Sequence, residues 1–272
     1  MRRIYCTFSG KQYDETTQRI VEDAPKFGVD EVRIYDDRWL LGTEFYKVNR
    51  WIFDLKSRNE HRGFGWYSFK PYVIMQEMER LERSGFGAWD GSSTEAARSG
   101  PQATILWTDA DTYPIADLTP LYEQCRKDGG IMLFAAEGCV QGAWTKRSCM
   151  MAMNADTPEY RYAPHAVGRF ALFEAGNYKA KQFLMEWQTY LLNPACVGLA
   201  PSPDEYPEYV EHRSDQAILG NLAHKYGLKL YREADGFGDG SQRDREIFGT
   251  VFKQVGQYDE PKSMEGSRYR NV

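Results

Sequence analysis

Two carboxylates separated by one residue, Asp109 and Asp111, end the segment Thr104–Asp111 (TILWTDAD). The apolar residues before them are typical of a buried strand, and in extended geometry residues i and i+2 point to the same side. In open α/β sheets, ligands bind beyond the carboxyl ends of the strands. Paired carboxylates there can hold Mg²⁺ or Mn²⁺, hard ions that prefer oxygen and often share substrate phosphates. The structural alternative is a turn with solvated or helix-capping carboxylates.

Strands and helices alternate around this pair, which predicts an α/β fold. β-branched and apolar runs indicate the strands, and apolar residues at helical spacing indicate the helices. The predicted strands are Arg3–Phe8, Glu31–Tyr35, Ala103–Thr108, Ile131–Ala135, Arg169–Phe173 and Leu228–Tyr231. The predicted helices are Tyr13–Phe27, Ser68–Arg83, a helix capped by Asp117, Asn177–Leu192 and Ser214–Tyr226.

No internal repeat or convincing linker divides the chain, so residues 1–258 are predicted to form one domain with inserted loops. Gly85–Pro101 is rich in Gly, Ser and Ala, and it is expected to be a surface loop or a lid. Residues 259–272 are expected to be a flexible C-terminal tail.

Composition excludes several classes of protein. The 272 residues include 34 Lys and Arg against 39 Asp and Glu, a net charge of −5, whereas a general nucleic-acid binder needs a basic footprint. No run approaches the roughly 18 apolar residues of a membrane span, and no apolar secretory signal is visible. The five cysteines lack C-x-x-C spacing, which argues against a disulfide framework or a structural zinc site. We therefore expect a cytoplasmic protein without a membrane span or a nucleic-acid partner.

Three segments, in this order, resemble motifs of nucleotide-sugar glycosyltransferases with the GT-A fold. Gly65–Pro71 (GWYSFKP) resembles the G-x-W-x-W-K-P stretch of a group of small microbial glycosyltransferase-like proteins. Asp109-Ala110-Asp111 matches the metal-binding Asp-x-Asp in type and place. Ser214–Leu219 (SDQAIL) is similar to the D-Q-x-x-L helix start of retaining galactosyl- and glucosyltransferases. The resemblance implies a GT-A (Rossmann-like) domain with a mixed, mostly parallel sheet flanked by helices.

The resemblance also implies an activity, that of a metal-dependent hexosyl- or pentosyltransferase. The expected donor is a nucleotide-diphosphate sugar, a UDP-sugar first of all, and the expected acceptor is a hydroxyl of a glycan. Asp109 and Asp111 would hold Mn²⁺ or Mg²⁺, a Lewis acid for the charge of the leaving diphosphate, and Asp109 would also contact the donor nucleotide. Lys70 can add a positive charge to the same diphosphate, unless it is a surface helix lysine.

The donor base is expected at the end of the first strand, where this family holds it. Phe8 can stack on the base, and Thr7 or Ser9 can bond to its edge, although Phe8 can equally be a core residue. Trp66 and Tyr67 can shape the donor pocket, with core packing preferred for at least one of them.

Asp215 and Gln216 match the pair that lies by the anomeric carbon in retaining relatives, and they are the expected catalytic residues. Asp215 can instead be a general base for an acceptor hydroxyl in an inverting reaction. The structural alternative is an ordinary helix start, with Ser214 as N-cap and Asp215 favoured by the helix dipole. Retaining relatives take a third metal ligand from a C-terminal H-x-x-G-x-x-K-P-W stretch that is missing here, so Asp235, Asp239 or water would have to replace it.

A rival interpretation comes from another class of enzyme. Asp109-Ala110-Asp111-Thr112 fits the D-x-D-x-T motif of haloacid-dehalogenase-like phosphatases, in which Asp109 would be the nucleophile, Asp111 the acid/base and Mg²⁺ a requirement. Gly238-Asp239 with Asp244 resembles their later acidic motif.

Two observations disfavour the phosphatase. A complete strand–helix–strand unit precedes Asp109, whereas the phosphatase motif usually opens its domain. The phosphatase also leaves Gly65–Pro71 and Ser214–Leu219 unexplained. A third class, a non-catalytic carbohydrate-binding module, would need no paired carboxylates at a strand end. The glycosyltransferase is the preferred hypothesis.

Overall fold

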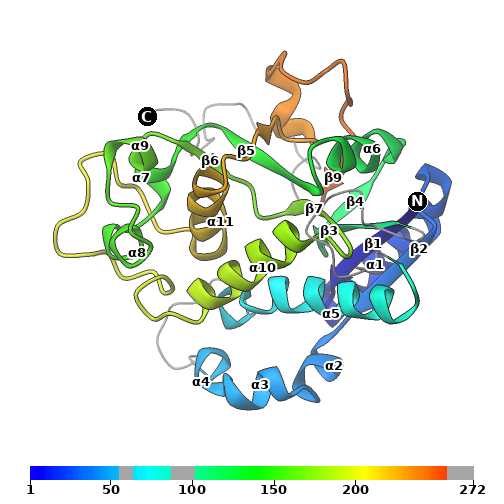
Figure 1. Ribbon diagram of the computed structural model, residues 1–272, viewed down its shortest axis with the longest axis horizontal. Coiled ribbons are helices and arrows are strands. Elements are labelled where there is room, and N and C mark those ends of the chain that lie inside the picture. Colours follow the sequence, from blue (N-terminus) through cyan, green and yellow to red (C-terminus); the bar gives the residue numbers. More distant parts are fainter. Residues whose placement is uncertain (55–63, 87–101, 256–272) are drawn as a thin grey trace.

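A seven-stranded sheet forms the centre of the protein, in the order β2-β1-β3-β7-β5-β6, with β8 paired to β5 (Figure 1). The structure is a computed structural model, and it describes residues 1–54, 64–86 and 102–255. The predicted tail, residues 259–272, lies outside the described residues, as does most of the predicted loop at 85–101.

The direction of the strands confirms a mixed, mostly parallel sheet. β1, β2 and β3 are parallel to one another. β7 is antiparallel to both β3 and β5, so β5 runs in the direction of β3. β8 is parallel to β5 and β6 is antiparallel to it, so only β6 and β7 oppose the other strands of the sheet. The strands are β1 (Arg2–Phe8), β2 (Glu31–Tyr35), β3 (Ala103–Asp109), β5 (Ile131–Val140), β6 (Pro164–Ala166), β7 (Phe170–Glu174) and β8 (Leu230–Tyr231).

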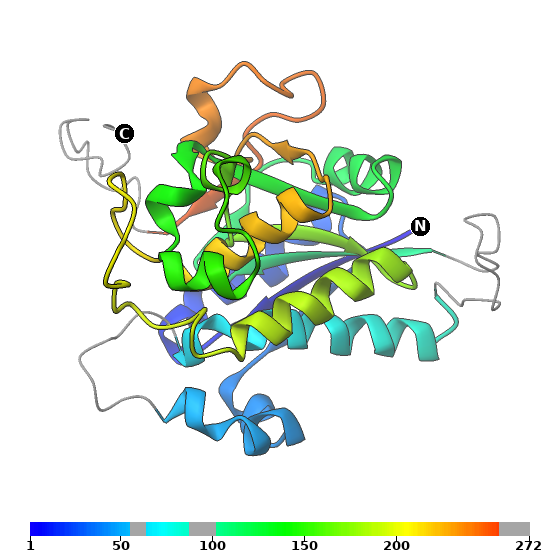
Figure 2. The ribbon, with the colours of Figure 1, turned by 60° about the vertical axis from the view of Figure 1, so that its left-hand side comes forward.

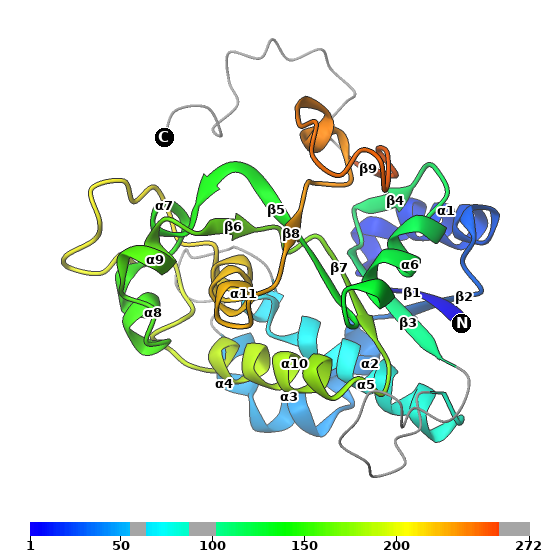
Figure 3. The ribbon, with the colours of Figure 1, turned by 45° about the horizontal axis from the view of Figure 1, so that its top comes forward.

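Helices bury both faces of this sheet, which explains why its central strands are apolar on both sides. Along β3, Ile105 and Trp107 face one core and Leu106 faces the other, as the alternation of a strand requires. The helices lie on opposite sides of the sheet in Figure 3, and α5 and α10 run side by side in Figure 2. The first face is covered by α5 (Phe69–Arg83), α10 (Tyr178–Leu191) and α11 (Ser214–Lys225), and the second by α1 (Asp14–Asp23) and α6 (Thr119–Lys127).

A small antiparallel sheet returns the end of the described chain to the paired carboxylates. β4 (Thr112–Pro114) follows Asp111 directly, and β9 (Phe252–Gln254) pairs with it. The backbone N–H of Val255 donates to the carbonyl of Asp111 at 2.8 Å. Gln254 bonds to the Asp111 side chain across a sequence separation of 143 residues. The residues after β3 are therefore held in place by a strand from a distant part of the sequence.

Most predicted elements are confirmed to within one or two residues, including β1 and β2. The predicted helix Tyr13–Phe27 is α1 followed by the 3-10 turn η2 (Ala24–Phe27), and the predicted strand Ile131–Ala135 continues to Val140. Two segments without periodicity in the sequence contain short helices instead. Helices this short are not stable alone, and tertiary packing holds them: Phe45 stacks on Tyr72 of α5 with ring centroids 4.3 Å apart, and Phe53 packs on Phe64 at 5.0 Å. The short helices are α2 (Asp37–Leu41), α3 (Glu44–Val48), α4 (Arg50–Phe53), α7 (Gln141–Trp144), α8 (Arg147–Ala152) and α9 (Pro158–Arg161).

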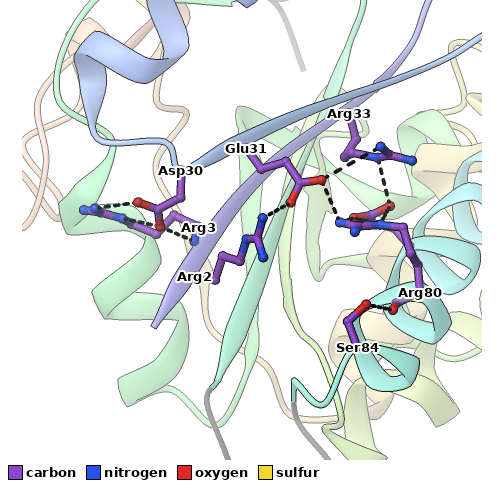
Figure 4. A network of polar contacts seen from close by, with 8 residues as sticks. Arg2, Arg3, Asp30, Glu31, Arg33, Arg80 and Ser84 are labelled. Atoms are coloured by element: carbon purple, nitrogen blue, oxygen red, sulfur yellow. Dashed lines mark hydrogen bonds and ion pairs between the residues drawn. The ribbon is translucent and has the colours of Figure 1, made fainter.

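A network of arginines and carboxylates joins the edge strand β2 to α5 (Figure 4). Glu77 of α5 is fully buried, and its Oε2 accepts from the Tyr35 hydroxyl at 2.8 Å. Arg80 Nε donates to Glu77 Oε1 at 3.0 Å, and Arg33 Nε lies 3.6 Å from Glu77 Oε2. Glu31 pairs with Arg80 at 3.0 Å. A buried carboxylate with this many donors anchors an otherwise exposed strand edge.

Replacing Glu77 by alanine is expected to lower the free energy of unfolding by about 2–3 kcal/mol, because the Tyr35 hydroxyl and Arg80 lose their buried acceptor. Urea denaturation measures this loss. Glu79→Ala is the matched control, since Glu79 lies on the same helix in an exposed pair with Arg83 and should cost about 0.5 kcal/mol or less. Equal losses in the two variants would show that the network does not stabilise the fold.

Candidate active site

Lys70, near the start of α5, is a buried cation between two carboxylates. Its Nζ lies 2.9 Å from Asp109 Oδ1 and 2.8 Å from Asp215 Oδ2, and it donates to the carbonyl of Gly168 at 3.1 Å. Only 2% of the Lys70 side chain is exposed, against 27% for Asp109 and 4% for Asp215. Three elements, α5, β3 and α11, therefore meet at one ammonium group. The alternative of a surface helix lysine is wrong.

The charges in this cluster control one another's ionisation. Burial alone would lower the pKa of Lys70, but the charges of Asp109 and Asp215 outweigh it and raise the pKa, so the ammonium stays charged. Burial raises the pKa of Asp109 to about 6. Lys70 opposes that shift, whereas repulsion by Asp111 and Asp215 adds to it. Two carboxylates contact one ammonium, and Asp111 adds a further negative charge near Asp109. The excess of negative charge makes this corner of the molecule attractive to a further cation.

Asp111 lies just beyond the end of β3, and both of its oxygens have protein donors. Oδ2 accepts from Gln254 Nε2 at 2.6 Å and Oδ1 from the Thr112 hydroxyl at 3.1 Å. Among the described residues, no three Asp, Glu, His or Cys side chains gather closely enough to hold a metal ion. Asp109 and Asp111 thus offer two carboxylates that repel each other, which fits an ion such as Mg²⁺ that is commonly held by one or two carboxylates plus substrate phosphates.

A cavity of about 440 Å³ opens beside these two carboxylates. It lies beyond the carboxyl ends of β1, β2 and β3, the place where open α/β sheets bind ligands, and its size suits a small organic ligand. One part of its wall is aromatic and the other carries carboxylates and an amide. The lining residues are Phe8, Gly10, Gln12, Tyr13, Asp37, Phe64, Tyr67, Phe69, Trp107, Asp109, Ala110 and Asp111.

The structure brings some of the predicted donor-binding residues to this cavity and leaves others behind it. Phe8 and Asp109 line the wall. Thr7 and Ser9 are buried, and the Ser9 hydroxyl bonds to that of Thr17 at 2.6 Å. Trp66 is 3% exposed and belongs to the apolar core. Lys70 contacts the Asp109 carboxylate but is not among the residues that line the cavity.

Sequence reasoning missed several residues of the wall, among them Gln12, Tyr13 and Asp37. Asp37 follows the end of β2 much as Asp111 follows the end of β3, so the rule that ligands bind beyond strand ends would have found it. Gln12 and Tyr13 form the short 3-10 turn η1 (Lys11–Tyr13) between β1 and α1. No spacing in the sequence distinguishes that turn from the predicted helix Tyr13–Phe27.

A left-handed turn just before α5 positions Lys70 beside its partners. Gly65, Trp66 and Tyr67 have φ values of 53°, 51° and 62°, a conformation that costs a residue with a side chain about 1–2 kcal/mol. A Cβ at Gly65 would come within 2.3 Å of the Phe53 ring, so only glycine fits there. The turn places the Tyr67 ring 4.5 Å from Lys70 Nζ. Strain of this kind is typically concentrated at functional sites.

The start of α11 differs from the prediction at Ser214. The N-cap is Arg213, no side chain caps the helix, and Ser214 Oγ is buried without a hydrogen-bond partner among the described residues. The expectation that Ser214 caps this helix is wrong because Ser214 is already inside its first turn. The Asp215 carboxylate turns to Lys70 instead, and Gln216 is half-buried beside it.

Asp235 and Asp239, the predicted alternatives for a third metal ligand, have other partners. Asp235 Oδ2 accepts from Arg169 Nη2 at 2.8 Å, and the same nitrogen lies 2.7 Å from Glu233 Oε2. Asp239 accepts from the Thr250 hydroxyl. The described part of the chain contains no group of three side chains that joins either aspartate to Asp109 and Asp111.

No protein-family model and no curated protein matches this sequence. The solved structures that this chain is similar to include glycosyltransferases. A glycosyltransferase involved in the glycosylation of the major capsid of PBCV-1 is 11% identical with a TM-score of 0.44, over 94% of each chain. Mouse xyloside xylosyltransferase 1 is 11% identical with a TM-score of 0.40, over 85% of this chain and 84% of that one.

The bifunctional glycosyltransferase WbbM is 11% identical with a TM-score of 0.43, over 81% of this chain. The present chain spans only 37% of the length of that protein. These likenesses concern the fold, and the chemistry has to follow from the residues of the site.

In the described residues, no helix is both long and apolar enough to cross a bilayer.

Glu233 is expected to make stability depend on pH. Burial raises its pKa to about 8, Arg169 opposes the shift and Asp235 adds to it. The folded protein therefore keeps this proton at neutral pH, while the unfolded chain loses it near pH 4.5. Unfolding becomes relatively easier as pH rises between these values and levels off above pH 8.

Glu233→Gln removes that penalty. The difference in the free energy of unfolding between the variant and the unmodified protein should therefore rise by about 1–3 kcal/mol from pH 5 to pH 8. Urea denaturation at both pH values measures this change. Glu44→Gln, which alters a side chain that is 77% exposed, serves as control and should show no such trend. A gain for Glu233→Gln that is equal at pH 5 and pH 8 would mean that its carboxyl is ionised normally in the folded state.

Proposed function

We propose that this protein is a metal-dependent glycosyltransferase. It would transfer a sugar from a nucleotide-diphosphate sugar, a UDP-sugar first of all, to a hydroxyl group of a glycan or another acceptor. The observation that carries the proposal is the cluster of Asp109, Asp215 and the buried Lys70 at the edge of a 440 Å³ cavity. This cluster joins the three sequence motifs that resemble those of glycosyltransferases, each from a different part of the chain.

In the proposal, the aromatic and acidic parts of the cavity receive different parts of the donor. Phe8 and Tyr13 are aromatic and near the end of β1, so either ring can stack on the base. Asp37 can accept hydrogen bonds from hydroxyls or from the base edge. Asp109 and Asp111 would hold Mn²⁺ or Mg²⁺ with the diphosphate. When bound, the ion would supply Lewis acidity that neutralises charge on the leaving diphosphate.

Lys70 supports this arrangement through its contact with Asp109 and does not itself line the cavity. Its ammonium lowers the pKa of Asp109 against the effect of burial, so it helps to keep the carboxylate in the charged form that a metal ion requires. This role differs from the direct phosphate contact expected from the sequence, because Lys70 is buried between Asp109 and Asp215. Asp215 in turn neutralises Lys70, and we assign the position nearest the sugar to the half-buried Gln216.

The phosphatase is not favoured. It requires acidic residues of a later motif near Asp109 to hold Mg²⁺. Asp239 bonds instead to Thr250, and Asp244 pairs with Lys229 at 2.7 Å. Within the described residues, no third acidic side chain joins Asp109 and Asp111 in a metal-binding group. The expected phosphatase cluster is therefore not assembled by the fold described here.

A thermal-shift panel of UDP, GDP, CDP and dTDP, each with and without Mn²⁺, tests the proposal. A ligand that binds only the folded state raises the melting temperature, and the rise grows with the logarithm of its excess over Kd. We expect one nucleotide, UDP first of all, to stabilise the protein strongly and only with the metal. Release of UDP from UDP-glucose, UDP-galactose or UDP-xylose then tests transfer or slow hydrolysis.

Asp111→Asn and Asp109→Ala should abolish the metal-dependent part of the shift without unfolding the protein. Asp37→Asn is the matched control, because it removes one negative charge from the same cavity but leaves the paired carboxylates intact. It should preserve the dependence on Mn²⁺ even if the affinity falls. Unchanged nucleotide affinity in both Asp109→Ala and Asp111→Asn would refute the metal assignment. No response to any nucleotide, with phosphate release from p-nitrophenyl phosphate in Mg²⁺, would favour the phosphatase instead.

A further inference from the structure

One cross-strand pair of residues holds both oxygens of the Asp111 carboxylate. Thr112 of β4 and Gln254 of β9 lie directly opposite each other in the small antiparallel sheet (Figure 3). The Gln254 amide donates from Nε2 to Asp111 Oδ2 at 2.6 Å, and the Thr112 hydroxyl donates to Oδ1 at 3.1 Å. A carboxylate with a donor on each oxygen has a fixed plane, because turning it would break both bonds.

The backbone around this pair is fixed as well. The hydroxyl of the fully buried Tyr5 donates to the carbonyl of Thr112 at 2.9 Å. The backbone N–H of Val255 donates to the carbonyl of Asp111 at 2.8 Å. The donors on the Asp111 carboxylate therefore keep their place, although Gln254 is 143 residues further along the chain.

The Gln254 amide has a single polar partner. A carboxylate only accepts hydrogen bonds, so the NH₂ end of the amide faces Asp111. The other end, Oε1, is buried and closes no hydrogen bond with any of the described residues. A hydrogen bond to a charged group and a buried acceptor without a donor are opposing contributions of similar size. Gln254 therefore contributes little to the free energy of unfolding, and its bond to Asp111 calls for a role other than stability.

We propose that Gln254 is a positioning residue for the binding of a divalent metal ion. Together with Thr112, its amide fixes the plane of the Asp111 carboxylate, while Lys70 holds Asp109 separately at 2.9 Å. The inference rests on the proposed function, in which Asp109 and Asp111 hold Mn²⁺ or Mg²⁺. Hydrogen bonds that orient a metal-binding side chain typically change metal affinity by about 10- to 100-fold.

Titration of the protein with Mn²⁺ in the presence of UDP, followed by the EPR signal of free Mn²⁺, measures this effect. Gln254→Met keeps the length of the side chain but has no donor, so the Kd for Mn²⁺ should rise about tenfold. The melting temperature of the metal-free variant should change by no more than about 2 °C. Thr112→Val removes the longer of the two bonds and should raise the Kd by a smaller factor. A purely structural role would lower the melting temperature of Gln254→Met and leave the Kd unchanged, which would overturn the inference.

Val255→Ala is the matched control on the neighbouring residue. The Val255 side chain is 50% exposed, and the variant keeps the backbone N–H that binds the Asp111 carbonyl. Its Kd for Mn²⁺ should equal that of the unmodified protein. An equal rise in Val255→Ala and Gln254→Met would show that any disturbance at the end of β9 weakens the site, and it would overturn the role of the amide.

The contact between Gln254 and Asp111 can be tested without metal or nucleotide. In ¹⁵N-labelled protein, the side-chain NH₂ signal of Gln254, assigned through its backbone resonances, should shift in Asp111→Ala and stay unchanged in Asp37→Ala. A signal that does not respond to Asp111→Ala would overturn the inference. If Gln254→Met does not fold, the Kd of Gln254→Ala and this signal decide.

The two measurements separate the inference from the function on which it rests. An unmodified protein that binds no Mn²⁺ in the presence of UDP would refute the metal assignment in the proposed function. The bond between Gln254 and Asp111 is decided by NMR independently of that outcome.

Discussion

The buried ammonium of Lys70 is the interaction on which the rest of the site depends. A charge taken out of water is stable only when opposite charges and hydrogen bonds surround it, and here they come from β3, α11 and the Gly168 carbonyl. Removing any one of them would leave the buried charge only partly compensated. The cluster therefore fixes how three elements meet, and its excess of carboxylates makes the adjoining cavity attractive to cations.

The reversed direction of β7 explains how Gly168 comes to this meeting point. Because β7 is antiparallel to β3, its first residues lie at the carboxyl end of β3. The N–H of Asp109 donates to the carbonyl of Arg169 at 2.7 Å, and the neighbouring Gly168 lies against Asp215 and Gln216. In a purely parallel sheet the neighbouring strand would begin at the other edge. In the mixed sheet, the start of β7 and the end of β3 therefore lie together at one site.

Much of the fold and part of the site could be predicted from the sequence. Apolar strands and apolar residues at helical spacing are local signals, and they were sufficient for most strands of the sheet and for its covering helices. The end of β3 identified Asp109 and Asp111 for the same reason. These local signals did not predict β6, which lies in a segment without a clear period. The sequence identified Lys70 as a candidate site residue but did not predict its burial, because that burial depends on partners far away in the sequence.

What the sequence could not show has a common cause, which is that it depends on tertiary contacts. The left-handed turn at Trp66, the return of Gln254 to Asp111, and the bond between Gln141 and His165 all join segments without a shared period or spacing. Ser214 is an instructive case. Its type is typical of an N-cap, but tertiary contacts of Asp215 shift the helix start, so local preference is overridden.

The start of α11 is held from several sides, and this bears on how a transferase could use it. The Asp215 carboxylate binds Lys70, and its carbonyl accepts from the Trp187 indole at 3.2 Å. The side chain of the next residue, Gln216, passes close to Gly168. The side chain and the backbone of Asp215 are thus held by independent partners on α5 and α10. Such a helix start can present a polar group to a reacting centre without reorganising, which is the condition under which fixed dipoles are most effective in catalysis.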